Sequence, residues 1–144
     1  MAVISKIVEG DLIDLSELLE ELSGNKTDIA KMTQNFRMMT ENKDYILLAA
    51  KEDNVLAGSL MGIICHDMAG DCRPFLVIEN VIVLKKYRGK GIGKLLMSEI
   101  EEIGKKRNCY YSMLVSGKDR IDAHNFYGSI GYEKDFVKGF KKYL

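Results

Sequence analysis

The segment VLKKYRGKGIGKLL, residues 83–96, places three glycines within five positions and constrains the fold more than any other part of the chain. Glycine weakens strands and helices, so the cluster predicts a break between an apolar strand before it and an apolar helix after it. Main-chain amides at a helix start have no intrahelical partner and lie at the positive end of the helix dipole. A strand, a glycine loop and a helix in this order therefore predict a site for a phosphate-bearing ligand.

Two common phosphate motifs do not fit this loop. The Walker A pattern requires Ser or Thr after Gly93-Lys94, and the chain has Leu95 there, with Arg88 in place of the first glycine. The dinucleotide pattern Gly-x-Gly-x-x-Gly fails at Lys94 or at Leu96, depending on where it begins. A tight turn without a ligand is the remaining alternative, but one glycine usually suffices for such a turn.

Hydropathy patterns around the glycine segment predict the other elements. Apolar residues at helical spacing predict helices over residues 11–23, 27–42, 92–103 and 120–131. Short apolar runs bounded by turn residues predict strands over residues 2–10, 44–53, 54–67, 75–84 and 109–116, with a final hairpin over 131–144.

The order of these elements predicts a mixed sheet. The strand before the glycines, the helix after them and the next strand form a βαβ unit, whose two strands must be parallel. The earlier strands are joined by short connections, such as the turn at Asp53-Asn54, and are expected to be antiparallel. We therefore expect an α/β (α+β) fold in a single domain, residues 1–144, with a central sheet of about seven strands flanked by about four helices.

Composition narrows the class of partner. Lys and Arg number 21, as do Asp and Glu, so the formal net charge is zero, which argues against nucleic acid or an anionic membrane as a partner. No apolar run approaches the ~18 residues of a membrane span, and the N-terminus lacks a signal-peptide pattern. With three cysteines, an odd number, the chain is expected to be cytoplasmic.

A third phosphate motif does fit the loop. Arg88-Gly89-Lys90-Gly91-Ile92-Gly93 has the form Arg-x-x-Gly-x-Gly, which resembles the coenzyme A pyrophosphate loop of the GNAT superfamily of N-acetyltransferases. Downstream, the chain also matches that family's Ala-x-x-Phe-Tyr-x-x-x-Gly-aromatic segment, at Ala123, Phe126, Tyr127, Gly131 and Tyr132. The resemblance extends over essentially the whole chain and implies acetyl-CoA as co-substrate.

The resemblance also implies where the coenzyme binds. The main chain of the strand at Val81, Ile82 and Val83 is expected to pair with the pantetheine arm, much as an added strand would. The pyrophosphate is expected to lie on the loop residues Arg88, Gly89, Lys90, Gly91, Ile92, Gly93 and Lys94. The family often has Asn seven residues before its Tyr, where this chain has Arg120, and Asn125 is a candidate replacement.

Two side chains are candidates for proton transfer. An alkylamine has a pKa near ~10.4 and must lose a proton before it attacks, and Glu79 is the leading base. By strand alternation Glu79 is expected on the same face as Val81, and it can act directly or through water. Tyr127 is the family-matched acid that protonates the leaving thiolate. No metal is expected, because His66 with Cys65, Asp67 and Cys72 lacks a standard zinc spacing.

The acceptor is expected to be the primary amine of a small molecule, attacked directly in a ternary complex. A protein or peptide N-acetyltransferase is one alternative. A non-catalytic acyl-CoA-binding sensor is the other, and the presence of both Glu79 and Tyr127 argues against it, because a sensor needs neither. The sequence leaves a homodimer open.

Overall fold

The computed structural model describes residues 1–144, which form two compact units, Met1–Met113 and Leu114–Leu144. The first unit contains the whole sheet and the second contains one helix and the C-terminal segment. The strands are β1 (Val3–Lys6), β2 (Tyr45–Glu52), β3 (Val55–Cys65), β4 (Phe75–Val83) and β5 (Ser112–Met113). The helices are α1 (Leu12–Ser23), α2 (Ile29–Thr40), α3 (Ile92–Lys106) and α4 (Ile121–Ser129), with short 3-10 turns η1 (Glu9–Asp11) and η2 (Lys85–Tyr87).

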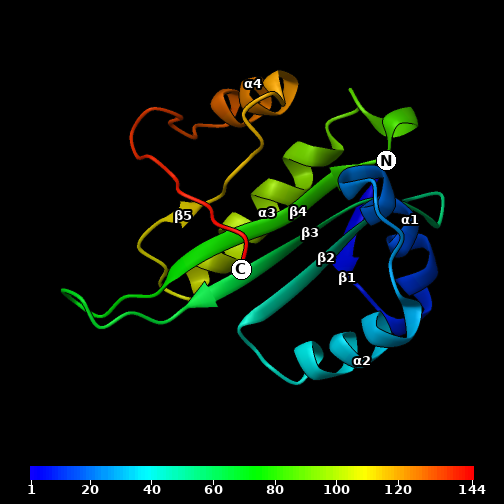
Figure 1. Cartoon of the computed structure of the whole chain (residues 1–144), viewed down its shortest axis with the longest axis horizontal. Coiled ribbons are helices and arrows are strands. Elements are labelled where there is room, and N and C mark those ends of the chain that lie inside the picture. The colour runs from blue at the N-terminus through cyan, green and yellow to red at the C-terminus, as the bar shows by residue number, and fades with distance from the viewer. The chain divides into compact units, whose positions relative to one another are not determined.

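The sheet is mixed, as predicted. Its strands follow the order β1-β2-β3-β4-β5, with antiparallel pairs up to β4 and a parallel pair between β4 and β5 (Figure 1). The turn between β2 and β3 has positive φ at Asp53 (51°) and Asn54 (63°), the conformation that favours Asp and Asn in a tight hairpin. Asp28 caps α2 by accepting a hydrogen bond from the amide of Lys31 at 3.1 Å.

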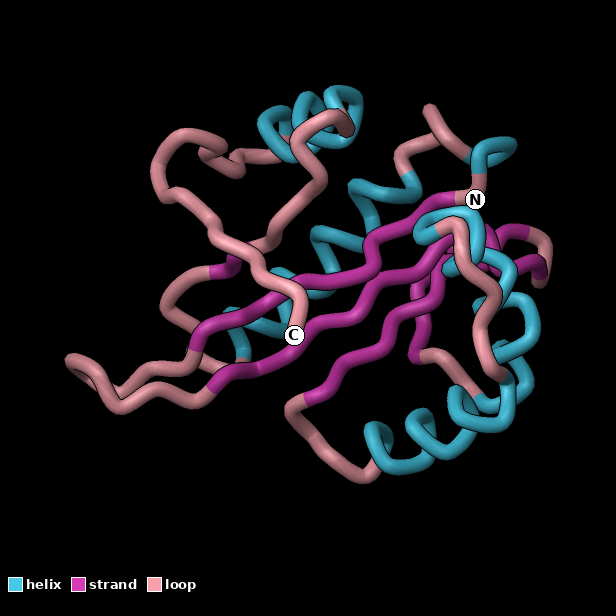
Figure 2. The backbone as a smooth tube through the Cα atoms, in the orientation of Figure 1, coloured by secondary structure: helices cyan, strands magenta, loops and turns pink.

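The prediction of about seven strands is wrong, because the sheet has five. The predicted strand over residues 109–116 is reduced to β5, and the predicted hairpin over residues 131–144 is loop throughout (Figure 2). In that segment Phe136 and Phe140 are 79% and 90% exposed. A two-stranded hairpin is marginal unless one face is buried, and this segment buries none of its large apolar side chains.

Helices cover both faces of the sheet in the first unit (Figure 1). On one face α3 lies so close that a Cβ at Gly58 would lie 3.2 Å from Cδ1 of Leu96 on that helix. A Cβ at Gly62 would overlap the buried side chain of Ile100. The opposite face packs on the leucines of α1, with Met32 and Phe36 of α2 at the margin. Buried side chains therefore hold α1 and α3 against the sheet.

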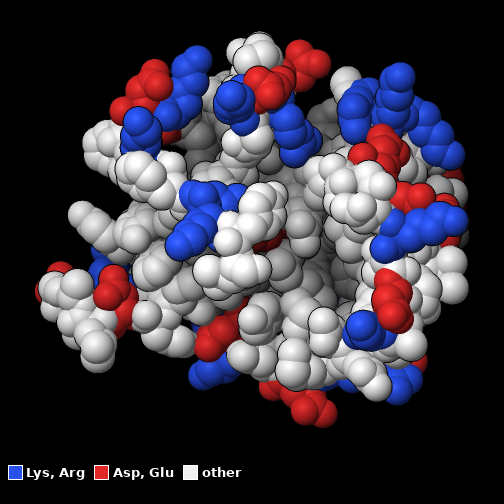
Figure 3. All heavy atoms as spheres, in the orientation of Figure 1, with Lys and Arg blue, Asp and Glu red and all other residues white.

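Basic and acidic side chains are interspersed over the face drawn in Figure 3, in keeping with a formal net charge of zero. No helix combines the length and the apolar character needed to cross a bilayer.

Candidate functional site

The loop between β4 and α3 presents a series of main-chain amides without partners. Gly89 and Gly91 have φ of 77° and 80°, in the left-handed region, and Gly91 is the N-cap residue of α3. The next hydrogen bond of the helix runs from the amide of Leu95 to the carbonyl of Gly91, at 3.0 Å. None of the amides of residues 89–94 donates to a main-chain carbonyl. These N–H groups can therefore bind an anion at the helix start.

The same loop is sterically open. A Cβ at Gly89 or Gly91 would meet no atom within 4 Å, so neither glycine is needed for tight packing. Their positive φ values explain why glycine is favoured, and the absence of side chains lets a ligand approach the backbone. The loop thus fits the pyrophosphate of coenzyme A, which needs several donors at close range.

Basic side chains lie around the loop. The ammonium groups of Lys86 and Lys90 lie 5.0 and 5.2 Å from the centre of the Tyr87 ring, within the range of a cation–π interaction. Lys94 is exposed on the first turn of α3. Ile92 differs from these, because its side chain is 2% exposed and packs in the core, so only its amide is available to a ligand.

Arg88 makes contacts that the sequence did not indicate. Its Nε donates to the main-chain oxygen of Val83 at 2.8 Å, and its Nη2 donates to Oε1 of Glu21 on α1 at 3.1 Å. The guanidinium is therefore directed toward the end of β4 and α1. That Arg88 contacts the coenzyme stays a prediction.

A β-bulge interrupts β4 beside the candidate base. Ser59 pairs with Ile82 and Met61 pairs with Glu79, so two steps on β3 correspond to three on β4. The extra residue coincides with Asn80, which is exposed and has a φ of 54°. Alternation is shifted by one residue here, so the prediction that Glu79 shares a face with Val81 by simple alternation is wrong. Glu79 instead shares its face with Ile82, and its side chain is partly exposed.

The edge of β4 toward β5 is open past the first few residues. The parallel ladder joins Leu76 to Ser112 and Val77 to Met113, and it ends there. The main chain from Val81 to Val83 therefore has no strand partner on that side, and Val83 bonds to Arg88 instead. An extended ligand can pair with this free edge in the way that a strand would.

The second unit contains the other motif. Tyr127 lies on α4 between two aromatic neighbours, with ring centroids 5.3 Å from Phe126 and 6.1 Å from Tyr132. The main-chain oxygen of Tyr127 accepts a hydrogen bond from the amide of Tyr132 at 3.0 Å, and Gly131 turns the chain with a φ of 101°. Asn125 is exposed on the same helix. Local contacts thus hold Tyr127 and Tyr132 together across the turn at Gly131.

The structure brings some predicted site residues together and leaves others apart. Glu79, Val81–Val83 and the loop of residues 88–94 follow one another along β4, η2 and α3 in the first unit. Asn125 and Tyr127 belong to the second unit. Their contribution to the same reaction stays a prediction. Sequence reasoning missed Asn80, although an Asn after a Glu within the apolar run FLVIENVIV was a signal for an irregular strand.

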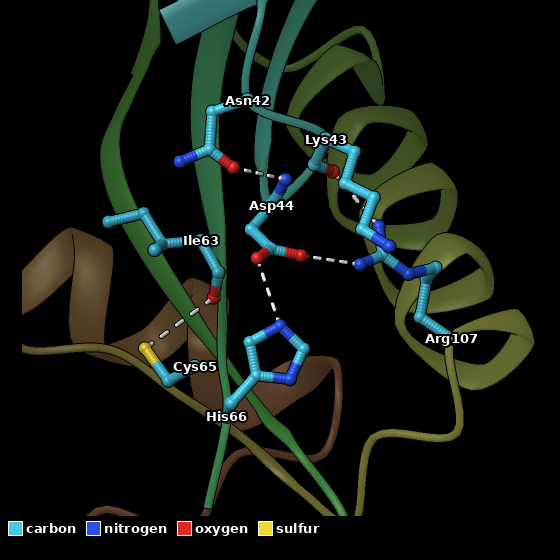
Figure 4. Close-up of polar contacts among 7 residues, drawn as sticks. All are labelled: Asn42, Lys43, Asp44, Ile63, Cys65, His66 and Arg107. Carbon is cyan, nitrogen blue, oxygen red and sulfur yellow. Dashed lines mark hydrogen bonds and ion pairs between the residues drawn. The ribbon is translucent and has the colours of Figure 1, made fainter.

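His66 has a different partner from the one considered for a metal. Its Nε2 lies 2.9 Å from Oδ2 of Asp44, and Nη2 of Arg107 donates to the other oxygen of Asp44 at 2.6 Å (Figure 4). Arg107 also donates to the main-chain oxygen of Lys43 at 2.9 Å. The structure contains no group of three His, Cys, Asp or Glu side chains arranged for a metal ion. The network instead joins the start of β2, the end of β3 and the end of α3.

Comparison with known families identifies the chain. Residues 13–132 match the model of the acetyltransferase (GNAT) family, so the chain belongs to this family of acetyltransferases. A putative acetyltransferase from Agrobacterium tumefaciens has the same fold, with a TM-score of 0.91 and 26% identity over 99% of both chains. The recognition of the family from the loop and the tyrosine segment is therefore confirmed.

Two curated relatives are similar in sequence. An uncharacterized N-acetyltransferase of Bacillus subtilis is 30% identical over 116 residues, which cover 78% of this chain and 75% of the relative. A probable glucosamine 6-phosphate N-acetyltransferase of Drosophila melanogaster is 28% identical over 120 residues, which cover 81% of this chain. That match spans 53% of the fly protein, about half of its length.

Proposed function

We propose that this protein is an N-acetyltransferase that transfers the acetyl group of acetyl-CoA to the primary amine of a small molecule. The observation that carries the proposal is the run of unpaired amides over residues 89–94 at the start of α3. Family membership supports it, because the loop lies where the Arg-x-x-Gly-x-Gly motif of this family falls.

The first unit provides the binding surface in this proposal. The amides of residues 89–94 hold the pyrophosphate, and Lys90 and Lys94 add positive charge beside it. The main chain of Val81, Ile82 and Val83 pairs with the pantetheine arm along the free edge of β4. When bound, acetyl-CoA supplies a thioester whose carbonyl carbon is open to attack by the amine within a ternary complex.

Two side chains move protons in this proposal. Glu79 takes the proton that the acceptor amine must lose, and its partial exposure allows it to act directly or through a water molecule. Tyr127 donates its hydroxyl proton to the departing sulfur. Asn80, beside Glu79, turns the chain so that this carboxylate lies on the face of Ile82, which sets where the amine must approach.

The small-molecule acceptor is supported by the name of the fly relative, which is a probable glucosamine 6-phosphate N-acetyltransferase. Because the match covers about half of that protein, the substrate class is part of the proposal. One alternative is an N-acetyltransferase that acts on a protein or peptide. The other is an acyl-CoA-binding sensor without catalytic activity.

A thiol-release assay with acetyl-CoA tests the proposal. The panel contains amino sugars and their phosphates, polyamines and peptides with free N-termini or lysines. We expect amine-dependent release of coenzyme A with at least one small amine. Calorimetry with coenzyme A and thermal melting with millimolar acetyl-CoA measure binding separately from turnover. A ligand that binds the native state raises the melting temperature. Absence of heat and of a melting shift would contradict the proposal, whereas tight binding without turnover would favour the sensor.

A further inference from the structure

Arg88 is the last residue between β4 and the loop of residues 89–94 whose amide donates a main-chain hydrogen bond. The amide of Tyr87 donates to the carbonyl of Leu84 at 2.8 Å and that of Arg88 donates to the carbonyl of Lys85 at 3.3 Å. From residue 89 to residue 94 no amide has a main-chain acceptor. The geometry of the loop therefore depends on how Arg88 is anchored on one side and on α3 on the other.

The side chain of Arg88 provides that anchor through two hydrogen bonds. Nε bonds to the main-chain oxygen of Val83 at 2.8 Å, which closes the η2 connection onto the end of β4. Nη2 bonds to Glu21 at 3.1 Å, and 67 residues separate the two partners in the chain. A planar guanidinium can make both bonds at once, in fixed directions, whereas an ammonium group is a single point charge.

Glu21 has a fixed position from which to hold Arg88. It lies on α1 next to Leu22 and three residues after Leu18, and both leucines pack into the core beneath the helix. Leu18 is 2% exposed, so this turn of α1 is firmly attached to the sheet. The side chains of Glu21 and Arg88 are 35% and 54% exposed, so packing alone does not fix either of them.

We propose that Glu21 is a positioning residue for coenzyme A binding. It acts through Arg88 to hold the loop of residues 89–94 in the conformation that leaves its amides free for the phosphates. This inference rests on the proposed function. In this arrangement Arg88 contacts Val83 and Glu21 rather than the phosphates, and the loop amides bind the ligand. Part of the ordering cost of the loop is thereby removed before the coenzyme arrives.

Direct binding of phosphate by Arg88 would predict the opposite change in coenzyme A affinity. If Arg88 were a phosphate ligand, Glu21 would compete for it, and removing Glu21 would tighten coenzyme A binding. Loss of a negative charge near an anion site also tightens binding by itself. A weaker affinity after removal of Glu21 is therefore a specific sign of lost positioning.

The test compares Glu21→Ala with Glu20→Ala. Glu20 is the neighbouring exposed carboxylate on the same turn of α1 and makes no ion pair, so both variants lose one charge and gain the same side chain. Relative to Glu20→Ala, we expect Glu21→Ala to weaken coenzyme A binding about two- to fivefold, the range that an exposed ion pair supports. KM for acetyl-CoA should rise by the same factor with kcat unchanged.

A double-mutant cycle and a measurement without ligand complete the test. In an Arg88→Gln background, Glu21→Ala should weaken affinity no more than Glu20→Ala does, because the pair is already broken. In the free protein, the ¹⁵N heteronuclear NOE of Gly89 and Gly91 should fall in Glu21→Ala and not in Glu20→Ala, which reports greater loop motion. Melting temperatures of the two variants should agree within a few degrees, because an exposed pair contributes little to stability.

Equal affinities and equal NOE values for the two variants would overturn the inference, as would tighter binding by Glu21→Ala. If the wild type does not bind coenzyme A, the proposed function fails, and the NOE comparison then decides by itself whether Glu21 orders the loop.

Discussion

Glu79 and Ile82 lie on the same face of the sheet although their positions along β4 are three residues apart. Their partners on β3, Met61 and Ser59, are two residues apart, as in a regular strand. The extra residue on β4 coincides with Asn80, whose φ of 54° turns the chain within the strand. The bulge thus determines on which face of the sheet the candidate base Glu79 lies. It lies beyond the last residue of β4 that pairs with β5.

The bulge makes a prediction about Asn80. Asn tolerates the left-handed region and Gly prefers it, whereas a β-branched residue is strained there. We expect Asn80→Gly to leave the free energy of unfolding within about 0.5 kcal/mol of wild type. Asn80→Val should lose about 1–2 kcal/mol and should also raise KM for acetyl-CoA. Urea unfolding and steady-state kinetics measure both effects, and equal stability of the two variants would argue against a required positive φ.

The loop glycines make a prediction about Gly91. Gly91→Val places a branched side chain at a φ of 80° and beside the amides that we propose bind the pyrophosphate. We expect coenzyme A affinity to fall more than tenfold, equivalent to at least about 1.4 kcal/mol, as measured by calorimetry. Gly70→Val is the matched control, because Gly70 also has positive φ and open surroundings but lies between β3 and β4. Similar losses of stability with near-normal affinity in both variants would show that Gly91 serves only the turn.

The proposed general acid makes a prediction about Tyr127. Tyr127→Phe removes one hydroxyl and almost no volume, so the aromatic packing with Phe126 and Tyr132 should persist. We expect kcat to fall about 10²–10⁴-fold while the Kd for acetyl-CoA changes little. Tyr143→Phe, at the exposed C-terminal end, is the control for loss of a phenol. A Tyr127→Phe enzyme with wild-type turnover would remove this residue from the mechanism.

The network around Asp44 makes a prediction about acid stability. Burial disfavours the ionised carboxylate, but hydrogen bonds from His66 and Arg107 outweigh this and hold the pKa of Asp44 below its ordinary value. The unfolded chain then binds the proton more readily than the folded one. The resulting stabilisation is present above the ordinary pKa of about 3.9 and is lost as pH falls through the lower pKa of the folded state.

Asp44→Asn tests this pH dependence. We expect the variant to be less stable than wild type at pH 7 and the difference to shrink at pH values below about 4. Urea unfolding at pH 7, 5, 4 and 3 measures it, with Asp71→Asn in the exposed β3–β4 connection as a control. A difference that stays constant with pH would mean that the ionised form of Asp44 contributes nothing.

Much of this protein follows from local sequence. The apolar run of β4, the glycines of the loop and the stripe of α3 predicted a strand, a glycine loop and a helix, and the structure contains all three in that order. The reason is that backbone conformation at Gly89 and Gly91, and burial along one side of α3, depend on residues close together in the chain. The family motif rests on the same local features.

Tertiary structure decided the rest. The hairpin predicted over residues 131–144 had the composition of strands, but strands need a partner edge and a buried face, neither of which is a property of the segment. The shift at Asn80 became visible only when β4 was paired with β3, because alternation within one strand does not reveal an extra residue. Arg88 meets Glu21 across 67 residues of chain, and no pattern around either residue indicates the other. The sequence alone determined where the glycine loop before α3 forms, while contacts between distant segments decided what holds that loop and which face of the sheet Glu79 occupies.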